Sequence, residues 1–182
     1  MKLLSDKTLF PAAATSGVVA GVTLAVVSYQ SFSSTPFNDT LFLILTGLTA
    51  VVYWYGLGRL GLRIKNGALH WAALISLASS FIYDMSSAAG TYFPAAYINS
   101  GVDTTVAYGM ALLSALGLLL AGYALLTERT RFGTAGVIYG ILSVLLGLMV
   151  FLGIGYAAYN PVLSVLLYFL GSYLLLHSRV RA

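Results

Sequence analysis

Residues 104–131 read TTVAYGMALLSALGLLLAGYALLTERTR, and they give the clearest indication of the fold class. Its first part, residues 104–126, carries no charged side chain. A helix rises about 1.5 Å per residue, so about 20 apolar residues cross the ~30 Å hydrocarbon core of a membrane. Asp103 precedes the run in the position of a helix cap, and Arg129 and Arg131 follow it. The stretch therefore predicts a membrane-spanning helix whose two ends differ in charge.

The whole chain has the composition of a membrane protein. Of its 182 residues, 59% are hydrophobic and 8% are charged, whereas about 25% of the residues in an ordinary soluble domain are charged. The connections between apolar runs are short, which predicts one compact, all-α transmembrane bundle over residues 1–182. Six runs are long enough to span, and they cover residues 10–29, 40–58, 68–89, 104–126, 133–153 and 161–177.

The basic residues predict the orientation of these six spans. All nine Lys and Arg residues stand before the first span or after the second, fourth and sixth. The alternate connections, residues 31–38, 93–103 and 154–160, contain none. Lys and Arg in short loops are retained in the cytoplasm, so we expect a multi-pass protein of the cell membrane with both termini cytoplasmic. This topology explains the net charge of +4 better than a nucleic-acid partner does.

Helix caps and aromatic residues support the same membrane planes. Asp39, Asp103 and Asn160 stand where the second, fourth and sixth spans should begin. Their side chains suit the free N–H groups of a first helical turn. Tryptophan favours the membrane–water interface, so Trp54 and Trp71 are expected in an aromatic belt at the cytoplasmic level.

Small residues recur at helical spacing in three of the spans. Lipid gives apolar helices no hydrophobic reason to associate, so close backbone approach has to supply the packing. The small residues are therefore predicted to be helix contacts, although glycine-rich stretches can also let a helix break and bind an ion. They are Ala13, Gly17, Gly21 and Ala25 in the first span, Ser114, Gly117, Ala121 and Ala124 in the fourth, and Gly133, Gly136, Gly140, Ser143 and Gly147 in the fifth.

Asp84 is the one acidic residue inside a predicted span. An aspartate in hydrocarbon costs ~3 kcal/mol or more, so its carboxyl group should face protein or water. Ser76, Ser80 and Ser87 share its helix face within an arc of about 80°, and Tyr83 precedes it. This face predicts a path for an ion, a proton or a solute, with Asp84 as a protonatable or cation-coordinating group. In the structural alternative, the serines bond to their own backbone and Asp84 is hydrated near the outer interface.

Two histidines, His70 and His177, are predicted at similar depth near the cytoplasmic interface. Two imidazoles can ligate a haem or a metal ion, so haem is a candidate cofactor with these residues as its axial ligands. The alternative is that both are ordinary interfacial histidines. The chain has no cysteine, which excludes disulfides and thiolate ligands. It also has no catalytic motif, which disfavours an enzyme.

Three functions fit these observations. The first is transport or permeation of an ion, a proton or a small solute through the helix bundle, and the intramembrane aspartate motivates it. The second is a non-catalytic transmembrane subunit of a larger membrane complex, such as a respiratory complex, because the loops are short. The third is a haem- or quinone-binding redox protein. Contact with membrane lipid is common to all three, and a homo-oligomer is compatible with each.

Overall fold

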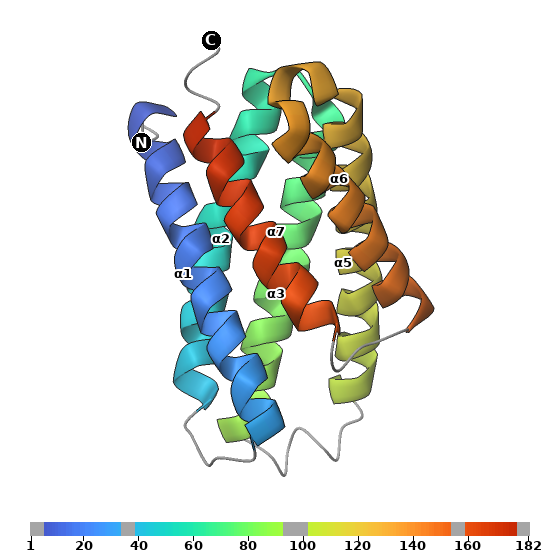
Figure 1. The fold of residues 1–182 in the computed structure, drawn as a ribbon. Helices are drawn as coiled ribbons and strands as arrows, with labels where there is room; N and C mark the ends of the chain where they lie inside the picture. The colour runs from blue at the N-terminus through green and yellow to red at the C-terminus, as the bar shows by residue number, and fades with distance from the viewer. Residues whose placement is uncertain (1–5, 34–38, 93–101, 154–158, 178–182) are drawn as a thin grey trace.

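The computed structural model describes residues 6–33, 39–92, 102–153 and 159–177, and within them it is all-α. The prediction of a compact six-helix bundle is confirmed (Figure 1). The expected apolar runs coincide with the helices to within a few residues at either end. The helices are α1 (Asp6–Ser33), α2 (Asp39–Arg63), α3 (Gly67–Tyr92), α5 (Val102–Thr127), α6 (Arg129–Leu152) and α7 (Tyr159–His177).

The six helices form a ring in chain order. Each helix packs against the ones before and after it in the sequence, and α7 closes the ring against α1. Contacts between α2 and α7 cross the interior. In Figure 1 the start of α1, the end of α7 and the turns after α2 and α5 lie together at the top of the bundle. Arg63, Lys65, Arg129 and Arg131 belong to this end, which we call the basic end.

The surface of the bundle carries many large apolar side chains, and its interior includes polar ones. Large side chains such as Val22, Leu48 and Leu116 are about half exposed on the outside of their helices, whereas Ser76, Ser143 and Ser172 are fully buried. A soluble protein rarely exposes large apolar side chains over so much of its surface. Three helical segments of the described chain, Lys7–Tyr29, Tyr108–Thr127 and Arg129–Leu152, are long and apolar enough to cross a membrane, and Gly67–Tyr83 and Pro161–His177 are shorter apolar helices. The chain is therefore a multi-pass membrane protein.

The turn between α2 and α3 is fixed by backbone and side-chain caps. Lys65 has a left-handed backbone with φ 59°, its N–H donates to the carbonyl of Leu62, and the N–H of Asn66 donates to the carbonyl of Gly61. This pair of bonds is the Schellman ending of a helix. The Oδ1 atom of Asn66 then accepts the N–H of Leu69 at 3.0 Å, so Asn66 also caps the start of α3.

The start of α6 contains a backbone break at Gly133. This residue has φ 59° and ψ −152°, a conformation that is essentially restricted to glycine. A Cβ atom at Gly133 would meet nothing within 4 Å. The prediction that Gly133 is a helix contact is therefore wrong. The glycine lets the turn that starts at Arg129 leave the axis of the longer helix that follows.

Candidate functional site: a cavity inside the ring

A cavity of about 280 Å³ occupies the half of the ring that lies away from the basic end. All six helices line it, mostly with residues from the part of the helix farther from that end. Much of the lining is hydroxyl-bearing. Lining residues include Leu24 of α1, Thr46 of α2, Ser80 of α3, Ser114 of α5, Leu146 of α6 and Ser164 of α7.

A second chamber of about 80 Å³ continues the cavity towards the middle of the bundle. The two chambers share Ser80, Ser114 and Ser164 in their walls, so they lie next to each other. Aromatic rings from α2 and α7 line the deeper chamber. The ring centroid of Tyr53 lies 5.0 Å from that of Trp54 and 4.9 Å from that of Tyr168. These rings make an aromatic floor where the cavity ends.

The floor is held by a pair of buried tyrosines. The hydroxyl of Tyr53 donates to the carbonyl of Leu167 at 3.1 Å and lies 3.3 Å from the hydroxyl of Tyr139. Both side chains are fully buried. Gly17 and Gly171 leave room for the Tyr53 ring, because a Cβ atom at either glycine would overlap it. Tyr53 stands ten residues before Arg63, which places this layer about 15 Å from the basic end, in the middle of the bundle.

Between the floor and the basic end the interior is filled with small and aliphatic side chains. A Cβ atom at Gly61 would come within 2.6 Å of the backbone nitrogen of His70, so α2 and α3 are in close backbone contact there. Buried leucines and alanines fill the remaining space. They are Leu57, Leu60, Leu69, Ala72, Ala73, Ala121, Ala124, Leu125, Leu174 and Leu175. The cavity is thus closed on one side by a packed half-bundle.

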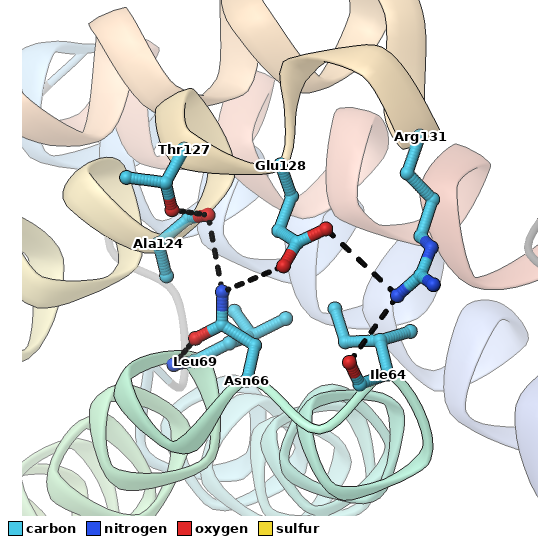
Figure 2. Close-up of polar contacts among 7 residues, drawn as sticks. All are labelled: Ile64, Asn66, Leu69, Ala124, Thr127, Glu128 and Arg131. Carbon is cyan, nitrogen blue, oxygen red and sulfur yellow. Dashed lines mark hydrogen bonds and ion pairs between the residues drawn. The ribbon is translucent and has the colours of Figure 1, made fainter.

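A polar cluster joins the two turns at the basic end (Figure 2). The amide nitrogen of Asn66 donates to the carbonyl of Ala124 at 3.4 Å and to Glu128 Oε1 at 3.5 Å. Arg131 donates to the carbonyl of Ile64 at 3.2 Å and lies 3.8 Å from Glu128. The ion pair is half exposed and so contributes little. The hydrogen bonds to backbone carbonyls tie the α2–α3 turn to the α5–α6 turn.

The residues predicted to form a path divide into three groups. Ser80 and Tyr83 line the cavity. Ser76 is 1% exposed and lies at the contact between α3 and α5, where a Cβ atom at Gly117 would overlap its hydroxyl. Asp84 and Ser87 belong to α3 farther from the basic end, and their side chains lie outside the described residues.

The structure places the two histidines apart in the ring. His70 of α3 is partly buried, and its Nδ1 atom lies 3.1 Å from the carbonyl of Gly58 in α2. His177 of α7 is exposed, and its Nδ1 atom lies 2.9 Å from the carbonyl of Tyr173, whose ring it stacks on. Helices α3 and α7 are not neighbours in the ring. Within the described residues no group of three or more His, Asp or Glu side chains could hold a metal ion.

Three of the four small residues predicted as contacts in the first span are buried against neighbouring helices. Ala13 faces Gly56 of α2. Gly17 accommodates the Tyr53 ring, and a Cβ atom added to Gly21 would lie 3.3 Å from the side chain of Tyr168 in α7. Ala25 is exposed.

The small residues of the fifth span face α5 and the break in their own helix. Gly140 and Gly147 would meet backbone carbonyls of α5 at 3.1 Å if they carried a Cβ atom. Gly136 would meet Phe132 of its own helix, because the chain folds back after the break at Gly133. Ser143 is fully buried.

Trp54 is the site residue whose location was predicted wrongly from the sequence. It is 7% exposed at the floor of the cavity, whereas Trp71 is 61% exposed. The predicted span ended at residue 58 and therefore placed Trp54 at the interface. Helix α2 continues to Arg63, which carries Trp54 deeper into the bundle. The spacing of Ala50, Tyr53 and Leu57 indicates one buried face of the helix. Trp54 stands beside that face, so its burial could have been predicted.

No protein-family model, curated protein or solved structure matches this chain. Function has to be inferred from the site itself, a cavity lined in large part by hydroxyl-bearing residues and closed towards the basic end by packed side chains.

Proposed function

We propose that this protein moves a small solute or ion across the membrane through the interior of the helix ring. The cavity carries this proposal, because every helix contributes to it and because it holds serine hydroxyls at the depth of a membrane. Polar groups inside a membrane bundle are costly and are commonly retained for a ligand or a pathway. Packing alone would be served better by the leucines and alanines that fill the other half.

The proposed orientation puts the basic end in the cytoplasm and the cavity on the opposite side. The distribution of lysine and arginine supports it, because the six that the structure describes belong to this end and the other three stand before α1 or after α7 in the sequence. The cavity would then be a vestibule that receives solute from outside the cell. The aromatic floor and the packed half between it and the basic end leave no continuous pore through the described part of the ring. This favours alternating access over free permeation.

Asp84 is proposed to act at the entrance of this vestibule. It follows Ser80, which lines the cavity, by one turn of α3 in the direction of the opposite end. A carboxyl group at that level could take up a proton or attract a cation. The replacement Asp84→Asn keeps the shape and removes the charge, and Asp103→Asn is the matched control at the same end of the bundle.

Flux measurements test the proposal. Liposomes containing the full chain would be challenged with protons, potassium, urea and glycerol, each followed against protein-free liposomes. We expect faster entry of at least one probe, and we expect Asp84→Asn to slow it or to change its pH dependence while Asp103→Asn does not. Rates equal to those of protein-free liposomes for all four probes would reject transport of these solute classes.

Cysteine labelling tests the vestibule independently of the solute, because the natural chain has no cysteine. A membrane-impermeant thiol reagent should label Ser164→Cys from outside intact cells. Ser76→Cys, buried between α3 and α5, is the control that should stay unlabelled. Labelling of Ser164→Cys from the cytoplasmic side alone would reverse the proposed orientation.

A further inference from the structure

We propose that the floor of the cavity binds an uncharged molecule that offers a hydrogen-bond acceptor, such as an amide, ketone or quinone oxygen, to the indole of Trp54. The inference rests on the proposed function, because it names the class of solute that the same cavity accepts. Three observations carry it: a buried donor without an acceptor, a surround of aromatic rings, and a lining without charge.

The donor is the indole N–H of Trp54. Its nitrogen is buried and has no hydrogen-bond partner within the described part of the chain. Trp54 lines the deeper chamber of the cavity. Leaving a buried donor unpaired costs ~1–3 kcal/mol, and an indole can only donate. The side chain lines the chamber while its nitrogen is buried, so an acceptor oxygen that reaches the nitrogen from the chamber would remove this cost, and the site favours molecules that carry one.

The aromatic rings define the shape and polarity of the rest of the molecule. The centroids of Trp54 and Tyr168 lie 6.3 Å apart, and Tyr53 lies about 5 Å from each. Rings in such tilted arrangements offer faces and edges to a flat or apolar group. Ser80, Ser114 and Ser164 add hydroxyls from three helices at the junction of the two chambers, and each hydroxyl can donate or accept.

The lining disfavours an ion at the floor. None of the residues that line either chamber in the described part of the chain carries a charged side chain. An ion that enters such a space loses its hydration and gains no counter-charge. An uncharged molecule loses less hydration. Asp84, one turn beyond Ser80, belongs to the entrance and is tested separately.

A matched set of probes tests the inference on the full chain in lipid nanodiscs. Benzamide, benzoate and benzamidinium have nearly the same shape and differ in charge. Trp71→Phe leaves Trp54 as the single tryptophan, because the chain contains two. We expect benzamide to change the Trp54 emission saturably and to bind at least about tenfold more tightly than either ion, a difference of ~1.4 kcal/mol.

Equilibrium dialysis of labelled benzamide then tests the role of the indole. Trp54→Phe keeps an aromatic ring and removes the donor, so its affinity should fall about tenfold or more. Trp71→Phe, the matched control on the exposed face of α3, should bind as the unaltered chain does. Ser164→Leu fills the cavity without changing Trp54 and should also abolish binding, which covers the case in which Trp54→Phe does not fold.

Several results would overturn the inference. They are no binding of benzamide, equal binding of benzoate or benzamidinium, and unchanged affinity in a folded Trp54→Phe variant. The proposed function fails in a different way. Saturable benzamide binding without flux of any probe would support the binding site and reject transport. Ion flux without benzamide binding would support transport and reject the binding site.

Discussion

The two halves of the bundle use small residues for opposite purposes. In the half near the basic end, glycine and alanine bring helix backbones together, and leucines and tyrosines fill what space remains. In the other half, Gly147 still packs against the backbone of α5, but serines of three helices face a cavity. Both kinds of residue recur at the same helical spacing in the sequence. Helical spacing therefore identifies an inward face, while the residue opposite decides whether that face packs or lines a cavity.

The two halves are therefore expected to contribute differently to stability and to binding. Close packing rigidifies a bundle and carries its stability, so the basic half and the tyrosine layer should dominate the free energy of unfolding. The open half buries less side-chain surface and should instead control binding. Substitutions in the two halves should therefore change stability and binding to different extents.

The largest effect is expected in the tyrosine layer. Gly171→Ala would put a Cβ atom onto the hydroxyl of Tyr53 and within 3.0 Å of the ring of Tyr139. Overpacking of this kind costs up to about 3 kcal/mol. Reversible unfolding in mixed micelles should show a loss of stability of that size.

Two further variants identify the cause of that loss. Tyr53→Phe removes the oxygen that the new methyl group would meet, so the double variant should recover part of the stability. Gly109→Ala is the control, because a Cβ atom there meets nothing within 4 Å, and alanine should stabilise its helix by up to ~1 kcal/mol. Equal losses at Gly171 and Gly109 would contradict the packed layer.

A smaller effect is expected at the basic end, where Asn66 has two roles. Its Oδ1 atom caps α3, and its Nδ2 atom bonds to Ala124 and Glu128. Asn66→Ala removes both and should cost about 1–2 kcal/mol. Asn66→Ser keeps a capping oxygen and loses the reach to α5, so an intermediate unfolding free energy separates the two roles. If Asn66→Ala left the free energy of unfolding unchanged, the two turns would be joined by packing alone.

The sequence predicted more of the fold than of the site. Runs of apolar residues located all six helices, because the thickness of a membrane sets their length. The rotation of each helix decides which serine meets open space, and that depends on the neighbouring helix. Ser76 and Ser80 stand on one face of α3, yet Ser76 meets Gly117 of α5 while Ser80 lines the cavity.

Two local features were also not predicted from the sequence, for physical reasons. Trp54 was assigned to the interface because α2 extends beyond its apolar run to Arg63. The break at Gly133 was hidden because a glycine in a stripe of small residues has the same spacing whether it packs or bends the chain.

A gain of stability is expected at Lys65. Its φ of 59° costs a non-glycine residue about 1 kcal/mol, and glycine is the usual residue at this position of a Schellman ending. Lys65→Gly should therefore raise the free energy of unfolding by about 1 kcal/mol. Lys65→Ala removes the charge and keeps the strain. If alanine stabilised the protein as much as glycine, the gain would come from charge and not from the backbone.

The smallest effect on stability is expected in the open half, at Ser114. Leucine at this position would extend into the cavity that Ser114 lines, so we expect a change within about 0.5 kcal/mol of zero, as for substitutions that meet no packed neighbour. The same change at Ser76, which is 1% exposed against α5, should cost about 2–3 kcal/mol through overpacking. Parallel unfolding curves of Ser114→Leu and Ser76→Leu make this comparison directly. The two serines carry the same side chain, so the two variants differ only in their surroundings. A similar loss of stability in both would mean that the far half is packed as tightly as the basic half. The cavity would then not be a space that a solute can enter.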